Sequence, residues 1–301
     1  MRLAPRSIIQ KIKKKISRQK HKREAPLVKK EQIVNDLKKI LNPGDHLILH
    51  SSLKSIGYVD GGAKTVIEAI SDAITPTGTL AVPTYSMKGT MYQTCQDKDY
   101  IFDPRSSDTR LGLIPAAFLT LPGIYRSIHP THSVSAIGKE AKFITEAHHL
   151  AESTFGNDSP WARLMKLDGK VLCIGMKMGR NTFSHVLEDR MLDDFPLPVR
   201  MKKTYFLKCK DWEGRLIEVP VNPLDPKYAK VRIDQQDRKD LRDYFWKEFI
   251  ISNVINVGRV GQAIAWASNL NRYYDHLVKL MQEGITIYSS PKEIEKRPVE
   301  S

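Results

Sequence analysis

Residues 46–83 constrain the fold more than any other part of the chain. They read HLILHSSLKSIGYVDGGAKTVIEAISDAITPTGTLAVP, in which two short apolar segments enclose a Ser- and Gly-rich loop and an amphipathic segment. Apolar residues recur at helical spacing over 66–74, which predicts a helix, and residues 47–49 and 80–82 are predicted to be buried strands. This strand–helix–strand order predicts an α/β protein with a sheet covered by helices.

Periodicity assigns much of the remaining chain. Apolar positions at helical spacing predict a helix over residues 33–41, and the polar stretch 84–112 is expected to be a long loop that lines a site. Residues 170–174 read as a buried strand, and residues 204–221 read as an antiparallel hairpin insertion. Residues 261–283 have helical period, so we expect a helix there that closes the fold.

The basicity of the chain is concentrated at its N-terminus. The formal net charge is +14, and residues 1–30 hold twelve Lys and Arg against one acid, Glu24, so the rest of the chain has about balanced charge. Four isoleucines at helical spacing in residues 1–23 are typical of a basic amphipathic helix, which suits an anionic membrane surface. A disordered tail and a nucleic-acid-binding tail remain alternatives, although we do not expect nucleic acid as a partner. We predict a tail over 1–28 and one domain over 29–301.

Composition and cysteine usage bear on localisation. Hydrophobic residues make up 41% and charged residues 27% of the chain, which is ordinary for a globular protein. The sequence contains no run of 18 apolar residues, so we expect no transmembrane helix. The three cysteines form no CxxC pair, which favours a reducing compartment. We expect a cytoplasmic protein that contacts the inner membrane surface through its tail.

Three separated motifs carry residue types suited to chemistry. The first is His-Ser-Ser-Leu-Lys-Ser-Ile-Gly at residues 50–57, followed by Gly61-Gly62. The second, at residues 122–133, contains Arg-Ser-Ile-His-Pro-Thr-His-Ser, and the third is Ser-His-Val-Leu-Glu at residues 184–188. In this order and spacing, residues 30–285 resemble the aminoglycoside 3-N-acetyltransferase family, also called the antibiotic N-acetyltransferases.

The resemblance implies transfer of an acetyl group from acetyl-CoA to an amine of an amino sugar. It also implies the family's α/β fold, in which helices flank a central mixed sheet. Acetyl-CoA is expected as a co-substrate, with no metal ion. Glycines permit close backbone approach, and the N–H groups of a loop and a helix start can bind a pyrophosphate. The residues expected to contact CoA are Ser51, Ser52, Leu53, Lys54, Ser55, Ile56, Gly57, Gly61, Gly62, Arg126, Ser127, Thr131, Ser133 and Val134.

The third motif matches the family's His-x-x-Glu pattern, which implies that His185 is the general base. An amine attacking a thioester must lose a proton, and a histidine with an acidic partner can accept it. Spacing of i, i+3 on a helix places Glu188 within reach of His185, so Glu188 is expected to orient the ring and stabilise the imidazolium. His129, in the second motif, is a further candidate catalytic residue, and direct transfer requires no nucleophilic Cys or Ser.

The acceptor is predicted from a departure from the family pattern. Aminoglycoside-modifying members have a pattern similar to Thr-Asp-Trp after the second strand, whereas this chain has Thr84-Tyr85-Ser86. Without an acid at this position, we expect a less cationic amino sugar, for example a nucleotide-linked sugar of surface-polysaccharide synthesis. An aminoglycoside 3-N-acetyltransferase that confers antibiotic resistance is the first alternative.

A metal-dependent hydrolase is the second alternative. The pairs His129/His132, His148/His149 and His185/Glu188 carry side chains that can ligate zinc. No HExxH motif is present, and the first pair spans a proline, so it is not expected to lie on a helix.

Overall fold

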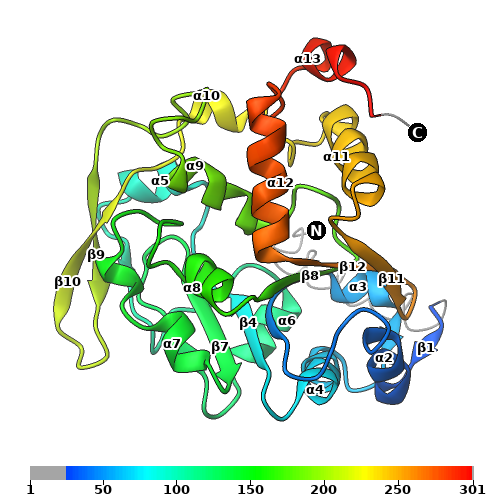
Figure 1. The fold of residues 1–301 in the computed structure, drawn as a ribbon. Helices are drawn as coiled ribbons and strands as arrows, with labels where there is room; N and C mark the ends of the chain where they lie inside the picture. The colour runs from blue at the N-terminus through cyan, green and yellow to red at the C-terminus, as the bar shows by residue number, and fades with distance from the viewer. Residues whose placement is uncertain (1–24, 300–301) are drawn as a thin grey trace, which may run out of the picture.

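The computed structural model describes residues 25–299, and its centre is a seven-stranded mixed sheet (Figure 1). This confirms the predicted α/β architecture with a central mixed sheet flanked by helices. No helix among the described residues is long and apolar enough to span a membrane. The predicted amphipathic segment, residues 1–23, lies outside the described residues. The order of the strands across the sheet is β11 (Asn256–Val260), β12 (Ala263–Asn269), β8 (Lys170–Ile174), β2 (His46–Ser51), β4 (Thr79–Pro83), β7 (Val134–Gly138) and β6 (Tyr125–Arg126).

Three parallel strands form the middle of the sheet. β2 pairs in parallel with β8 on one side and with β4 on the other, while every outer pairing is antiparallel. Leu47, Ile48 and Leu49 of β2 are all buried, as expected for a central strand covered on both faces. The parallel arrangement brings the carboxyl ends of β2, β4 and β8 to one edge of the sheet.

Each face of the sheet carries its own hydrophobic core. One face is covered by α2 (Lys30–Leu37), α4 (Ala63–Ile74) and α6 (Leu113–Phe118). The opposite face packs against a larger group of helices (Figure 1). These are α7 (Ala141–Thr145), α8 (Pro160–Lys166), α9 (Val186–Arg190), α11 (Lys239–Ile251) and α12 (Leu270–Gln282).

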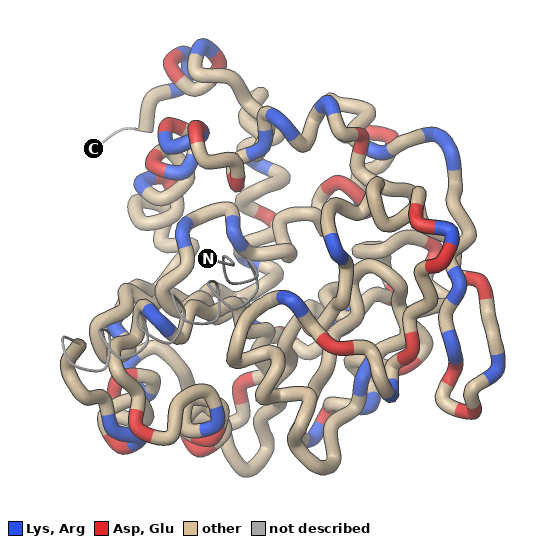
Figure 2. Tube along the Cα trace, turned by 180° about the vertical axis from the view of Figure 1, so that it is seen from behind, with Lys and Arg blue, Asp and Glu red and all other residues tan. Residues whose placement is uncertain are grey.

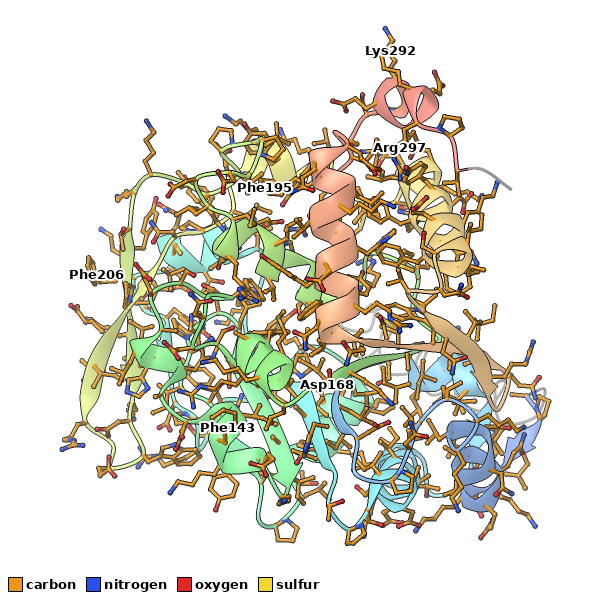
Figure 3. The ribbon with its side chains drawn as sticks, viewed as in Figure 1. Phe143, Asp168, Phe195, Phe206, Lys292 and Arg297 are labelled. Atoms are coloured by element: carbon orange, nitrogen blue, oxygen red, sulfur yellow. The ribbon has the colours of Figure 1, made fainter. Side chains whose placement is uncertain are left out.

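A second, smaller sheet lies beside the main one and contains the predicted hairpin. β9 (Tyr205–Lys210) and β10 (Leu216–Val221) pair antiparallel, and β5 (Ile101–Phe102) joins β9 in parallel. The hairpin extends along one side of the molecule, where Phe206 projects from β9 into solvent (Figures 1 and 3). Its inner residues Cys209 and Val219 pack on Phe102.

The remaining described elements are short. β1 (Leu27–Val28) pairs in parallel with β3 (Tyr58–Val59). The other helices are α3 (Leu53–Ile56), α5 (Met91–Gln96), α10 (Pro226–Ala229) and α13 (Pro291–Lys296), with 3₁₀ turns η1 (His148–Leu150) and η2 (Thr182–His185). Lys292 marks α13 at the outer end of the molecule (Figure 3).

Two predicted elements differ from the structure. The helical assignment of 261–283 is wrong for its first part, because Ala263–Asn269 is strand β12 and only Leu270–Gln282 is helical. Residues 84–112 are not a continuous loop, because they contain α5 and β5. The fold also does not end at residue 283, since Ile285, Ile287 and Tyr288 are buried in the larger core.

Candidate functional site

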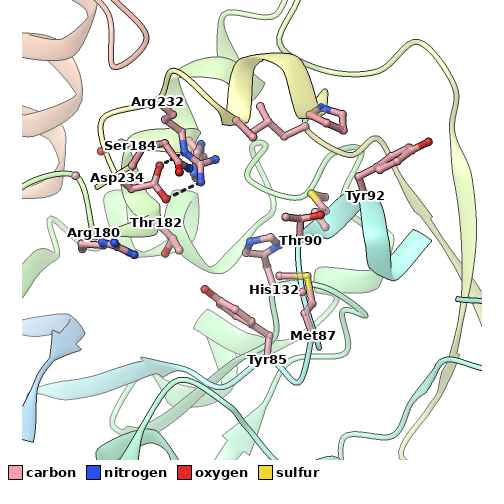
Figure 4. A pocket seen from close by; sticks show the side chains of 18 of the residues that line it. Tyr85, Met87, Thr90, Tyr92, His132, Arg180, Thr182, Ser184, Arg232 and Asp234 are labelled. Carbon is pink, nitrogen blue, oxygen red and sulfur yellow. Dashed lines mark hydrogen bonds and ion pairs between the residues drawn. The ribbon is translucent and has the colours of Figure 1, made fainter. Parts of the chain in front are cut away.

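A cavity of about 920 Å³ opens where the segments that follow β4 and β8 meet. Tyr85 follows β4, and η2 with His185 follows β8, so both line the cavity from the same edge of the sheet. Ligand sites in α/β proteins lie beyond the carboxyl ends of parallel strands. In Figure 4, His132 and Tyr85 lie between a wall that carries Arg180 and Asp234 and an opposite wall that carries Met87 and Tyr92.

His185 and Glu188 form the hydrogen bond that their spacing predicts. Nδ1 of His185 lies 2.9 Å from Oε1 of Glu188, across the junction of η2 and α9. The carboxylate accepts, so Nδ1 carries the proton and the lone pair is on Nε2. Nε2 makes no hydrogen bond among residues 25–299, and the ring lines the cavity. A neutral imidazole in this tautomer can accept a proton from a molecule in the cavity.

Glu188 is buried and is held by groups from distant segments. The hydroxyl of Tyr288 donates to Oε1 of Glu188 at 2.5 Å, and Nη2 of Arg200 forms an ion pair with Oε2 at 3.3 Å. Burial raises the pKa of Glu188, but His185, Arg200 and Tyr288 outweigh it and hold the pKa below its usual range. Burial and the charge of Glu188 raise the pKa of Tyr288 well above its usual value. The carboxylate is therefore ionised while the tyrosine remains a donor.

Arg200 ties a second acid to this network. Its Nη2 lies 2.8 Å from Oδ1 of Asp189, whose other oxygen accepts a hydrogen bond of 2.8 Å from the backbone N–H of Phe155. The Phe155 ring lies 5.4 Å from the His185 ring, centroid to centroid, and beneath the Arg200 guanidinium. The base is thus fixed on one edge by Glu188 and is contacted by the tilted ring of Phe155.

A second group of histidines lies in the interior beside the cavity. His129 stacks on His148 with ring centroids 4.3 Å apart, and Nδ1 of His129 accepts the backbone N–H groups of Thr131 and His132. His132 lines the cavity, 4.9 Å from the ring of Tyr85, whereas His129 does not line it. Burial holds the pKa values of His129 and His132 well below the usual range and lowers that of His148 to about 3.

The sequence model of the family described as aminoglycoside 3-N-acetyltransferase matches residues 48–282. Aminoglycoside N(3)-acetyltransferase III of Pseudomonas aeruginosa is 32% identical over 248 residues, which cover 77% of this chain and 86% of that protein. The chain belongs to the aminoglycoside 3-N-acetyltransferase family. Aminoglycoside N(3)-acetyltransferase III of a Salmonella species is 36% identical over 157 residues, 48% of this chain. That match spans 54% of the Salmonella protein, so the chain matches about half the length of this relative.

Solved structures of aminoglycoside acetyltransferases share the fold. The crystal structure of AAC(3)-Xa superimposes with a TM-score of 0.72 at 27% identity, covering 86% of this chain and 94% of that one. The binary complex of AAC-IIIb with CoASH superimposes with a TM-score of 0.72 at 23% identity, covering 88% of this chain and all of that one.

The first motif of this family member lies at the same edge of the sheet as the cavity, although it does not line it. The backbone N–H of Ser52 donates to Ile174 O at 2.9 Å, and Ser55 packs against Gly175, the start of the segment that leads to His185. Lys54 is exposed and forms no ion pair within the described part of the chain. Ser51 and Leu53 are half-buried beside it, whereas Ile56 is part of the core.

The three glycines of this loop have different surroundings. All have positive φ, at 114° for Gly57, 73° for Gly61 and 68° for Gly62, a conformation that side chains disfavour. A Cβ on Gly57 would lie 3.1 Å from both Pro26 O and the Val28 side chain, so close packing against β1 requires that glycine. A Cβ on Gly62 would meet nothing within 4 Å, which leaves open space beside the start of α4.

Arg126 of the second motif is an interior residue. Its guanidinium donates to the carbonyl oxygens of Thr84 and Ser107 at 2.6 Å each, and to Ser133 Oγ at 3.3 Å. Burial lowers the pKa of Arg126 to about 10. The side chain fixes the backbone next to Tyr85, which lines the cavity, and does not itself line it.

The other predicted residues of this motif are also buried. Ser127 accepts a hydrogen bond from Val134 N–H at 2.9 Å and lies 3.1 Å from Nδ1 of His148. Thr131, Ser133 and Val134 are fully buried, and none of them lines the cavity. The structure therefore brings this motif against the cavity through His132 alone among its described side chains.

Several residues of the site were not predicted from the sequence. Phe155 and Tyr288 come from segments far from residues 184–188, Arg200 follows Glu188 by 12 residues, and none of the three has a spacing that predicts the contact. Asp189 had a local signal, since it is an acid next to Glu188. No three His, Cys, Asp or Glu side chains among residues 25–299 are arranged to hold a metal ion, so the hydrolase alternative lacks a ligand set there.

Proposed function

We propose that this protein is an acetyl-CoA-dependent N-acetyltransferase that acetylates an amine of an amino sugar. The observation that carries the proposal is the 2.9 Å hydrogen bond from His185 Nδ1 to Glu188, which leaves Nε2 available to the cavity. Membership of the aminoglycoside 3-N-acetyltransferase family supports the same reaction.

In the proposed reaction, His185 Nε2 accepts a proton as the amine nitrogen attacks the thioester carbonyl. The carbon–nitrogen bond forms, the carbon–sulfur bond breaks, and the imidazolium returns its proton to the departing thiolate. Glu188 stabilises the imidazolium through the Nδ1–H hydrogen bond and keeps the ring in one tautomer. The reaction needs no covalent enzyme intermediate.

The first motif is the proposed contact for CoA. The open space beside Gly62, the start of α4 and the exposed ammonium of Lys54 suit a pyrophosphate, because a helix N-terminus and a cation both attract anions. In this proposal, the pantetheine part of CoA runs from the loop past Gly175 into the cavity. The complex of AAC-IIIb with CoASH supports CoA as the co-substrate of this fold.

Two acceptor classes are candidates. The names of the relatives favour an aminoglycoside, with antibiotic resistance as the consequence. Tyr85 lines the cavity at the position where the pattern of antibiotic-modifying members has an acidic residue. This difference favours a less cationic amino sugar, such as a nucleotide-linked precursor of surface polysaccharide. A contact of residues 1–23 with an anionic membrane surface remains a prediction.

The direct test combines binding and turnover. Purified protein is titrated with acetyl-CoA in a calorimeter, and thiol release is then followed with kanamycin and with neutral and phosphorylated amino sugars. We expect the protein to bind acetyl-CoA and to release thiol only when an acceptor and His185 are both present. The control variant His149→Ala, outside the cavity, should bind acetyl-CoA and release thiol as wild type does. Absence of acetyl-CoA binding would contradict the proposal.

A further inference from the structure

The charged side chains that line the cavity are strongly biased to one sign. Asp234 is the single acid among the described residues of the lining. The cations of the lining are Lys88, Arg110, Arg180, Arg200, Lys230 and Arg232. A site built for a polycationic acceptor would be expected to show the opposite bias, because like charges repel.

Two of these cations are neutralised by acids of the protein. Arg232 forms a bidentate pair with Asp234 at 2.6 and 2.9 Å (Figure 4). Arg200 is paired with Asp189 and Glu188. Burial raises the pKa of Asp234, but the hydrogen bonds and charge of Arg232 outweigh it and lower the pKa, so this carboxylate is ionised and already has its partner.

The other four cations form the group that we call the rim cations, namely Lys88, Arg110, Arg180 and Lys230. Each is exposed, and none forms an ion pair within residues 25–299. They come from four separate segments, which follow β4, precede α6, follow β8 and follow α10, and all four line the same cavity.

The rim differs from the rest of the protein surface. Figure 2 shows Lys and Arg interspersed with Asp and Glu along the described chain, and ion pairs such as Lys30–Asp72 and Arg215–Asp211 are common there. One exposed cation contributes little by itself, whereas several of one sign around a concave site focus the field and attract anions.

We propose that the rim cations bind a phosphoryl group carried by the acceptor, so that the acceptor is an amino sugar bearing a phosphate or diphosphate. This inference rests on the proposed acetyl transfer. The phosphoryl group sits at the mouth of the cavity, and the amine lies deeper, where Nε2 of His185 is available. The same charges disfavour aminoglycosides, which carry several ammonium groups.

CoA is the competing source of phosphate at the rim, and the experiment separates the two sources. Calorimetry measures the affinity for CoA alone, and then the affinity for uridine diphosphate of enzyme saturated with CoA. Both are repeated with a variant in which all four rim cations are replaced by Gln. A control variant replaces four exposed lysines that do not line the cavity by Gln, at Lys39, Lys139, Lys166 and Lys292.

If the acceptor carries the phosphate, CoA-saturated enzyme binds uridine diphosphate, and the rim variant loses at least about tenfold in this affinity. CoA affinity changes less than about twofold, and the control variant resembles wild type in both. A rim variant that loses CoA affinity overturns the inference. So does CoA-saturated wild type that does not bind uridine diphosphate.

Turnover gives an independent readout. With saturating acetyl-CoA, kcat/KM for glucosamine 1-phosphate is expected to exceed that for glucosamine by at least about tenfold, and the advantage should shrink between 0.05 and about 0.5 M salt as the charges are screened. Equal values for the two sugars, or a preference for kanamycin, overturn the inference while leaving acetyl transfer intact. Failure to bind acetyl-CoA contradicts the proposed function instead.

Discussion

Two histidine sites lie on the same side of the sheet and differ in what surrounds the ring. His185 has a buried carboxylate on Nδ1, and its Nε2 is available to a cavity. His129 has no carboxylate partner among the described residues, and its Nδ1 already accepts two backbone N–H groups. Burial keeps His129 neutral, whereas the pair of His185 with Glu188 can hold a transferred proton. A carboxylate partner and access to a cavity, rather than burial, distinguish a candidate base from a structural histidine.

The largest expected effect is on the His185 side of this comparison. His185→Ala should lower kcat by about 10²–10⁴-fold while CoA affinity changes less than about twofold, because proton transfer is lost and the cavity is kept. Steady-state kinetics and calorimetry measure the two quantities. His129→Gln is the matched variant, and it should mainly lower the free energy of unfolding, by about 1–3 kcal/mol, because the amide oxygen of Gln stands farther along the side chain than Nδ1 and the buried backbone donors lose an acceptor at that position. A larger loss of kcat in His129→Gln than in His185→Ala would reverse the comparison.

A second prediction concerns histidines that are buried without a carboxylate. Burial lowers the pKa of His50 to about 4, below the value near 6.5 expected for an unfolded chain. The unfolded state therefore binds the extra proton, and the contribution of His50 to stability is full above pH 6.5 and lost as the pH falls through about 4. Between pH 7 and pH 5, His50→Gln should lose about 2 kcal/mol less of its unfolding free energy than wild type does. Urea unfolding at several pH values measures this, and parallel pH curves for the two proteins would contradict it.

Glu188→Gln tests whether the charge of the carboxylate partner is what makes His185, unlike His129, a candidate base. The amide keeps an oxygen that can accept from Nδ1–H but removes the charge that stabilises the imidazolium, so kcat should fall by about 10–10²-fold, less than in His185→Ala. Arg200 would then lose one of its two acidic partners, so unfolding is measured in parallel to separate stability from rate. Wild-type kcat in a folded Glu188→Gln protein would show that the charge is not used.

Local patterns predicted the features whose partners are close in sequence. The hairpin at 204–221 and the contact between His185 and Glu188 depend on neighbouring residues, and both are present. The helix prediction was wrong for residues 263–269 because small alanines flank Trp266, and this pattern is also compatible with a helix. Pairing with β8, where Ala265 lies opposite Ile174, makes the segment a strand. Pairing between distant segments is tertiary information that a periodic pattern does not contain.

The same limit applies within the site. Arg126 was expected to contact CoA because its motif resembles that of the family, yet in the structure its guanidinium donates to the carbonyl oxygens of Thr84 and Ser107. Nothing in the sequence predicted the contact of Tyr288 with Glu188, because the two residues are 100 positions apart and Tyr288 lies beyond the segment that the family model matches. Its position depends on how the chain after α12 returns over the larger core.

Tyr288 gives the smallest expected effect and the sharpest test of how Glu188 is held. Tyr288→Phe removes the hydroxyl that lies 2.5 Å from Glu188 Oε1, while His185 and Arg200 still contact the carboxylate. The hydrogen bond from Tyr288 lowers the pKa of Glu188, so its loss should raise that pKa and move the acidic limb of the kcat profile to higher pH. We expect kcat to fall about 3–10-fold, with KM unchanged. Tyr274→Phe, whose ring lies against Arg190 outside the cavity, is the control. A change in KM without a shift of the pH profile would show that Tyr288 shapes the cavity and does not act through Glu188.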